Sequence, residues 1–206
     1  MLRILFSAAL AGGVLLSGAT MAQTAQKEIG RAPTGVYELD AAHSQILFGI
    51  SHIGLTDYHG RFDKLSGTLN LDASQPEKSA TTITIDTGSV DTPSAELNDI
   101  LKGSSVFATN QFPTATFKST SVVRTGPDTG KITGQLTIRG VTKPVTLDVV
   151  FNGGQTDPLK GIFDVGFSAK TTIKRSDFGL TGMIWGSFVG DEVTLEIEAL
   201  FGQEKE

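Results

Sequence analysis

The three histidines of the chain, His43, His52 and His59, are its first candidates for metal or acid–base chemistry. His52 and His59 flank a predicted turn at residues 54–57, so across a hairpin they could bind a metal ion together with Asp57. Their spacing matches no established ligand motif. We favour the alternative that they are polar residues at strand ends bonded to backbone groups, and we predict no metal site.

A second candidate is the run Lys174-Arg175-Ser176-Asp177, which joins a predicted strand to an apolar loop. Arg175 could bind a phosphate or another polar head group, because its guanidinium presents several donors to an anion. The alternative is that Arg175 pairs with Asp177 and fixes the turn. We favour the ion pair, and both interpretations stay open at this point.

No catalytic machinery stands out elsewhere in the sequence. The chain has no cysteine, which excludes thiol catalysis, disulfides and iron–sulfur ligation. It also lacks a hydrolase nucleophile motif, a glycine-rich phosphate loop and a pair of carboxylates suited to acid–base work. We therefore predict no catalytic residue and no cofactor. A hydrolase that uses His52 or Asp177 is the weaker alternative.

Residues 1–22 have the layout of a secretory signal peptide, in which Arg3 precedes a long uncharged apolar run and then small residues. We prefer cleavage after Ala22 to cleavage after Ala19. An uncleaved anchor is the alternative, because about 20 apolar residues can span a bilayer. Glycines within the run favour cleavage, so we expect an exported protein with no membrane span after its signal is removed.

The remaining chain is dominated by strand signals. Residues 23–35 are polar and aperiodic, which is typical of a short flexible segment. From residue 36, Thr, Val, Ile and Phe alternate with polar residues at a period of two, and Gly, Pro, Asp or Asn interrupt the runs. One domain is expected over residues 36–203. Eight strands are predicted, at residues 36–52, 58–71, 80–90, 114–124, 131–139, 145–151, 162–175 and 192–200. The first of them is expected to bend near residues 41–42.

The predicted connections determine the architecture. Most are short, with turn signals at residues 126–128, 140–144 and 153–154, and short links imply antiparallel neighbours. One buried face on each strand fits a sandwich or a closed barrel. Glycines placed at bends within the strands favour closure. We predict an all-β fold with one or two short helices, namely an eight-stranded antiparallel β-barrel.

A helix is predicted at residues 93–103, across one end of the barrel. Thr92 can cap it, Pro93 suits its first position and Gly103 can end it. Its apolar stripe consists of Leu97, Ile100 and Leu101.

Residues 176–190 form a loop that is unusually apolar and spaced by glycines. A loop of this composition is not expected to lie open in water without a reason. Two roles are open for it: a flexible lid at a barrel mouth, or a plug in one barrel end.

The predicted interior leaves its content open. An eight-stranded barrel has room for packed side chains or for one small ligand. Phe, Ile, Leu and Val suit an apolar guest, but a filled core is favoured from alternation alone, because most inward apolar residues are simply core. The net charge of −5 and the lack of a basic patch argue against nucleic acid. A homodimer through the barrel walls or an end loop is compatible with the sequence.

Short runs in a fixed order cover about residues 36–200. They include Tyr37-Glu38-Leu39-Asp40, Gly60-Arg61-Phe62, Phe112-Pro113-Thr114-Ala115-Thr116, Gly134-Gln135-Leu136-Thr137, Arg175-Ser176-Asp177-Phe178-Gly179 and Val189-Gly190-Asp191-Glu192. In these runs the chain resembles the YceI family of periplasmic polyisoprenoid-binding proteins. One departure is Asn98-Asp99, where typical members carry Arg-Asp, and it puts the role of this helix start in doubt.

The resemblance implies a lipocalin-like barrel in the periplasm. Its pore would hold a polyisoprenoid, such as a prenyl quinone or a polyprenyl phosphate, or another long-chain amphiphile. The head-group candidates are His52, Arg175 and Asp177. The residues expected to line the pore are Phe48, Ile50, Phe62, Ile85, Phe117, Leu136, Ile138, Phe167, Ile173, Trp185 and Phe188. The alternatives are a stress-induced periplasmic interaction protein and, less favoured, a hydrolase acting on the bound lipid.

Overall fold

The structure is a computed structural model that describes residues 25–182 and 187–204. The predicted signal peptide lies outside the described residues. One α-helix, α1 (Ala95–Lys102), and short 3-10 turns accompany the strands. The strands are β1 (Gly35–Leu39), β2 (Gln45–His52), β3 (Thr56–Phe62), β4 (Leu65–Leu71), β5 (Ala80–Asp86), β6 (Val90–Asp91), β7 (Thr114–Arg124), β8 (Thr129–Ile138), β9 (Val141–Thr156), β10 (Phe163–Lys174) and β11 (Val189–Gln203).

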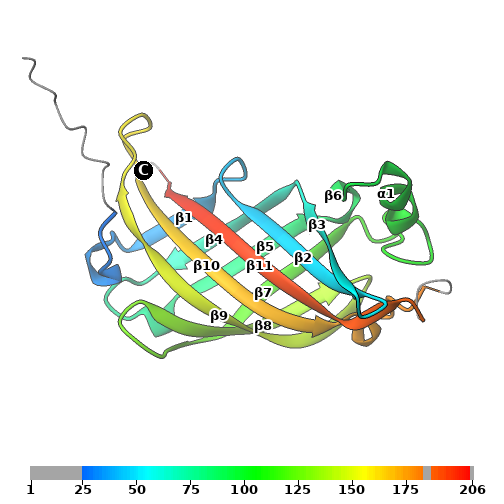
Figure 1. Ribbon diagram of the computed structural model, residues 1–206. Helices are drawn as coiled ribbons and strands as arrows, with labels where there is room; N and C mark the ends of the chain where they lie inside the picture. The colour runs from blue at the N-terminus through cyan, green and yellow to red at the C-terminus, as the bar shows by residue number, and fades with distance from the viewer. Residues whose placement is uncertain (1–24, 183–186, 205–206) are drawn as a thin grey trace, which may run out of the picture.

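These strands form one antiparallel sheet that closes on itself, because β1 pairs with both β4 and β11 (Figure 1). Three predicted strands are each divided in two. β1 and β2 pair with different parts of β11, β3 pairs with β2, and β4 pairs with β1. β5 and β6 pair with β4 and β3 in the same way. The wall therefore has eight strand positions, and the predicted eight-stranded barrel is confirmed.

The three breaks occupy neighbouring strand positions of the wall, and the second and third are bonded to each other. At the first, Asp40 accepts a hydrogen bond from the Ala42 amide at 3.0 Å. The second and third are joined, because the Lys64 amide donates to the Ser89 hydroxyl at 3.0 Å and the Asp63 amide donates to the Ser89 carbonyl. Local side-chain bonds thus replace strand pairing where the wall bends.

Two turn predictions are wrong, because β9 is longer than the predicted 145–151. The turn before it contains only Arg139 and Gly140, both with positive φ. Pro144 lies inside β9, where it pairs with β8. The pairing of β9 with β10 stops at Asp148, so the proline's missing amide proton leaves no hydrogen bond to β10 unmade. Gly153-Gly154 also lies within β9.

The glycine pair makes room for the N-terminal segment, which was predicted to be flexible. A Cβ on Gly153 would lie 2.8 Å from the Cβ of Ala25, and Gln26 exchanges two backbone hydrogen bonds with Gly154. Ala32, farther along the segment, is buried. Parts of residues 25–34 thus contact the barrel, and the flexibility of the segment stays a prediction.

The two ends of the barrel differ (Figure 1). One end, here called the α1 end, carries α1 and the connections at residues 53–55, 92–113 and 139–140, together with residues 175–182 and 187–188. The other, here called the N-terminal end, carries residues 25–34 and the connections at 72–79, 125–128 and 157–162. No helix of the described ranges has the length and apolar character needed to cross a membrane.

Helix α1 starts later than predicted. Ser94 is its N-cap and accepts a hydrogen bond from the Leu97 amide at 3.3 Å, whereas Pro93 precedes the helix. Thr92 is buried outside the helix, with its hydroxyl donating to the Asn98 side chain. Gly103 ends the helix, as predicted.

Candidate functional site

The inward faces of the strands enclose an apolar cavity of about 500 Å³. This volume lies within the roughly 300–1,000 Å³ typical of small-molecule sites. Every strand except β6 contributes to its lining, because alternate residues of a strand point to the same face. Nine predicted pore residues line it: Phe48, Ile50, Phe62, Ile85, Phe117, Leu136, Ile138, Phe167 and Ile173. Contact of these side chains with a lipid remains a prediction.

Aromatic side chains pack against one another at the N-terminal end of the barrel. The ring of Phe167 lies 5.4 Å from that of Phe151 and 6.2 Å from that of Phe201. Tyr37 is fully buried beside them and donates its hydroxyl to the Pro33 carbonyl at 2.7 Å. Burial raises the pKa of Tyr37 to about 12. Phe167 and Phe201 also line the cavity, so this end combines a packed cluster with part of the cavity wall.

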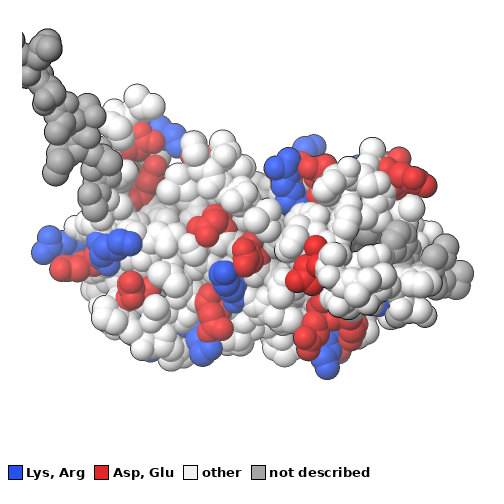
Figure 2. Space-filling model, viewed as in Figure 1, with Lys and Arg blue, Asp and Glu red and all other residues white. Residues whose placement is uncertain are grey.

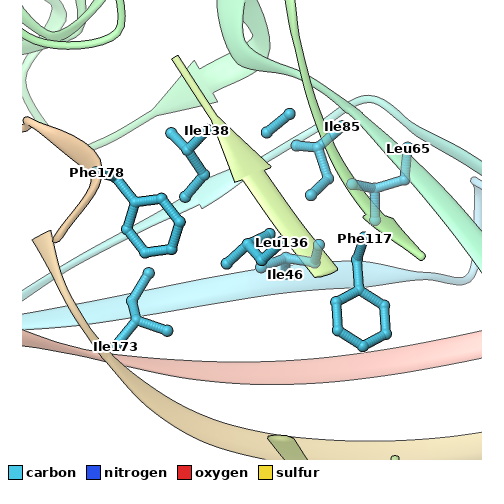
Figure 3. Packing of buried hydrophobic residues seen from close by; sticks show 9 residues of the cluster. Ile46, Leu65, Ile85, Phe117, Leu136, Ile138, Ile173 and Phe178 are labelled. Carbon is cyan, nitrogen blue, oxygen red and sulfur yellow. The ribbon is translucent and has the colours of Figure 1, made fainter. Parts of the chain in front are cut away.

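A second cluster of buried side chains surrounds the rest of the cavity. Figure 3 shows Ile138, Phe178 and Ile173 facing one another, with Leu136 and Phe117 farther along the wall. These side chains also line the cavity, apart from Phe178, which packs beside it. A barrel filled along its whole length, the interpretation favoured from alternation alone, therefore does not describe this structure.

Residues of the α1 end complete the cavity. Leu97 and Leu101 of the helix line it, whereas Ile100, predicted on the same stripe, is 36% exposed. Val106 and Phe107 also line it, with the Phe107 ring 5.6 Å from that of Phe62. Sequence analysis missed this pair. Its signal is two adjacent apolar residues in a connection of small and polar residues.

Arg175 lines the cavity but is held by the protein itself. Its guanidinium donates to the backbone carbonyls of Leu180 at 2.7 Å, Gly190 at 2.8 Å and Val189 at 3.3 Å. It makes no ion pair with Asp177 within the described ranges. The favoured ion-pair interpretation is therefore wrong, and Arg175 ties the two described ends of the β10–β11 connection together. A contact with a head group stays a prediction.

Asp177 is exposed and is not part of the cavity wall. The acidic partner at this turn is Asp191, which accepts hydrogen bonds from the hydroxyl of Ser176 at 2.7 Å and from its amide at 3.0 Å. The bond from the Ser176 hydroxyl is the main reason that the pKa of Asp191 is lowered. Sequence analysis missed Asp191, because nothing in its spacing marks it as the closing contact.

The structure separates the candidate histidines. His52 lines the cavity at the α1 end, and its cross-strand neighbour is Thr56. His59 pairs with Gly49 and lies against Thr194, on the outer face of the wall. No cluster of three metal-ligating side chains occurs in residues 25–182 and 187–204. Of the two residues that the hydrolase hypothesis offered as alternatives, His52 lines the cavity and Asp177 does not.

The last two predicted pore residues lie in the β10–β11 connection. Trp185 is outside the described residues. Phe188 is 54% exposed and does not line the cavity, so this prediction is wrong. Its neighbour Val189 points inward instead, because β11 begins there and successive side chains alternate. Leu180, from the same connection, lines the cavity and was not predicted.

A group of titratable side chains lies on the outside of the N-terminal end. Lys160 and His43 both contact the Asp40 carboxylate, and the hydrogen bond from Lys160 is the main cause that lowers the pKa of Asp40 to about 2. Asp164 is buried nearby, which raises its pKa. In Figure 2, Lys and Arg side chains on the visible face are scattered among Asp and Glu.

The residue that departs from the family pattern has a structural role. Asn98 accepts hydrogen bonds from the Thr92 amide at 2.8 Å and the Thr92 hydroxyl at 2.7 Å, and donates to Asp91 at 3.2 Å. It joins the start of α1 to β6. The neutral amide therefore fixes the position of the helix without a positive charge.

Comparison with known proteins agrees with this geometry. A UPF0312 protein of Ectopseudomonas mendocina is 38% identical over 173 residues, which is 83% of this chain and 90% of the relative. The crystal structure of Burkholderia cenocepacia BcnA covers 79% of this chain and 98% of its own, at 27% identity and a TM-score of 0.72.

A domain from Saccharophagus degradans, described as polyisoprenoid binding, shares the fold. Its TM-score is 0.64 at 19% identity, and the match covers 82% of this chain and 98% of that one. The model of the YceI-like domain matches residues 37–201. The chain therefore belongs to the YceI-like family.

Proposed function

We propose that this protein binds a long apolar lipid chain inside its barrel and acts as a carrier or reservoir for it, without chemical turnover. The observation that carries the proposal is the apolar cavity, whose wall is built largely of inward Phe, Ile, Leu and Val side chains. The best-supported ligand class is a polyisoprenoid, such as a prenyl quinone or a polyprenyl phosphate. The polyisoprenoid-binding domain of S. degradans, which has the same fold, supports this class.

The wall suits a hydrocarbon chain because apolar burial requires no matching polar contacts. Each buried methylene group contributes roughly 0.8 kcal/mol, reduced by the cost of ordering the chain. Polar lining groups occur at both ends, with His52, Tyr58, Thr92 and Arg175 at the α1 end and Ser79 and Thr81 at the N-terminal end. We place the head group at the α1 end, because Arg175 lies in the wall there and can bind an anionic group. The predicted signal peptide supports the periplasm as the location.

The test is extraction of lipid from protein purified without detergent, followed by mass spectrometry. Ala169 is a buried, lining residue of β10, so Ala169→Trp should fill part of the cavity and lower the lipid content several-fold. Thr172→Trp is the matched control on the exposed face of the same strand and should leave the lipid content unchanged.

Three results would oppose the proposal. Wild-type protein free of lipid, with no uptake of added prenyl quinone, would remove its basis. Equal lipid content in both tryptophan variants would place the lipid outside the cavity. Conversion of a bound prenyl phosphate, lost in His52→Ala, would show an enzyme instead of a carrier.

A further inference from the structure

Three large apolar side chains are exposed together at the α1 end. Leu55 is 78% exposed, Phe188 54% and Ile53 52%. Ile53 and Leu55 belong to the turn between β2 and β3, and the Ile53 amide donates to the Phe188 carbonyl at 2.7 Å. We call these three residues the apolar tip. A group of this kind marks an interaction site more often than a single exposed apolar residue does.

The tip includes a residue that the fold itself does not require. Ile53 has a φ of 47° and Gly54 a φ of 70°, so the two central residues of the turn are left-handed. Such turns favour Asn-Gly, and a β-branched residue in this region is a genuine outlier. Asparagine would serve the turn better. The isoleucine therefore needs an explanation outside folding.

The tip is continuous with the cavity. His52 directly precedes Ile53, and Val189 directly follows Phe188, and both line the cavity. His52 is also exposed, so the wall is open to solvent beside the tip. At the N-terminal end, the lining residue Ala80 is exposed too. Exposed lining residues therefore occur at both ends, but the apolar tip occurs only at the α1 end.

The charges around the tip restrict its partner. Asp57 follows the turn, and Asp191 and Glu192 follow Phe188 by a few residues, and all three are exposed. The exposed Lys174 is the cross-strand neighbour of Glu192 and offsets part of this negative charge. Acidic groups beside an apolar surface oppose approach to an anionic membrane. They do not oppose a bilayer of zwitterionic lipid, into whose interface exposed Leu, Ile and Phe side chains can partition.

We propose that the α1 end docks on a bilayer of neutral lipid, with the apolar tip inserted among the head groups. A lipid chain could then pass between the membrane and the cavity beside His52 without crossing water. This inference rests on the proposed function and adds to it the surface from which the ligand is taken.

The test measures binding of delipidated protein to phosphatidylcholine vesicles by flotation. The variant Leu55→Ser with Phe188→Ser should bind at least about tenfold more weakly, because two apolar side chains lose their burial in the interface. Leu159→Ser is the matched control, since Leu159 is 94% exposed at the N-terminal end and should not matter. Replacing part of the lipid with phosphatidylglycerol should weaken binding at low salt.

A second variant separates docking from folding. Ile53→Asn should keep or raise the unfolding temperature, because asparagine tolerates the left-handed turn, yet it should weaken vesicle binding. Weaker binding together with a lower unfolding temperature would instead make Ile53 a structural residue and oppose the inference.

The remaining outcomes are distinct. Equal vesicle binding by wild type and the double variant would overturn the inference. So would a concentration-dependent dimer, formed without vesicles and abolished in the double variant, because a second copy would then cover the tip. Lipid found in purified protein that does not bind vesicles would refute docking alone. Vesicle binding by a protein with no internal lipid would refute the proposed function alone.

Discussion

Replacing Arg175 with alanine should destabilise the protein even when no lipid is bound. The guanidinium donates three hydrogen bonds to carbonyls that lie on both sides of the β10–β11 connection. If the residue serves mainly as a head-group contact, its loss should instead matter only in the presence of ligand. The two roles therefore make different predictions for delipidated protein.

The expected magnitude follows from the geometry of these bonds. Two of them are short, at 2.7 and 2.8 Å, and the third is 3.3 Å. A hydrogen bond to a charged group contributes about 1.5–3 kcal/mol when buried. Arg175 is only half-buried and the freed carbonyls can bond to water, so about 2–3 kcal/mol in total is expected. For a domain of this size that corresponds to a fall of about 5–10 °C in Tm.

The assay is thermal unfolding of delipidated protein, combined with hydrogen exchange at the amides of residues 176–182 and 187–190. Exchange should become faster in Arg175→Ala before global unfolding. Arg175→Lys should recover only a minor part of the stability, because an ammonium group cannot reproduce the planar fork. Lys174→Ala is the neighbouring control and should change Tm by less than about 2 °C, as expected for an exposed residue.

One result would refute this reasoning. An unchanged Tm and unchanged exchange in delipidated Arg175→Ala, together with a loss of lipid retention, would show that the three backbone contacts are dispensable. Arg175 would then be a head-group ligand, as the first of its two sequence interpretations proposed. A fall in Tm with lipid retention intact would confirm its structural role.

Three further changes test the electrostatics and packing of the wall. Asp40→Asn should lower the free energy of unfolding by about 1 kcal/mol at pH 7. In urea unfolding of the wild type, this contribution should disappear as the pH falls from about 4 toward 2, because the carboxylate held by Lys160 becomes protonated. Asp164→Asn should be more stable than wild type by about 1–2 kcal/mol at pH 7, and the difference should vanish near pH 3. Burial raises the pKa of the Asp164 carboxyl, so the wild type loses stability as the pH rises and this group ionises. Gly134→Ala should cost about 2–3 kcal/mol in denaturant unfolding, since its Cβ would lie 2.6 Å from a backbone carbonyl, whereas Gly30→Ala, with its nearest atom at 3.8 Å, should be nearly neutral.

The barrel wall was predictable because apolar and polar residues alternate along each strand with the same period of two as inward and outward side chains. Ile46, Phe48 and Ile50 were assigned to one face, and all three line the cavity. The period shifts where a strand carries a bulge. In β7 the register shifts between Ser119 and Ser121, after which Val122 points inward. No local signal in the sequence marks that bulge.

The roles of glycine and arginine were less predictable, because one residue type serves several purposes. Gly153-Gly154 has the composition of a turn, but its lack of side chains lets residues 25 and 26 approach the strand. Arg175 was assigned to an anion or to Asp177, both charged partners. Backbone carbonyls compete for the same donors, and which of them lie within reach depends on the path of a loop far along the chain.

The segments at the two ends of the barrel are held in place by different interactions. At the N-terminal end, apolar side chains of the docked segment and of the strands pack against one another, so folding removes most of their surface from water. At the α1 end, much of the fixation is polar: Arg139 donates to the carbonyls of Ser104 and Gly179, as Arg175 does within its own loop. Loops held through their backbones do not need every apolar side chain for packing. The exposed Ile53, Leu55 and Phe188 are therefore separable from the stability of the fold, which is the condition for a surface that can be kept for contact with a membrane.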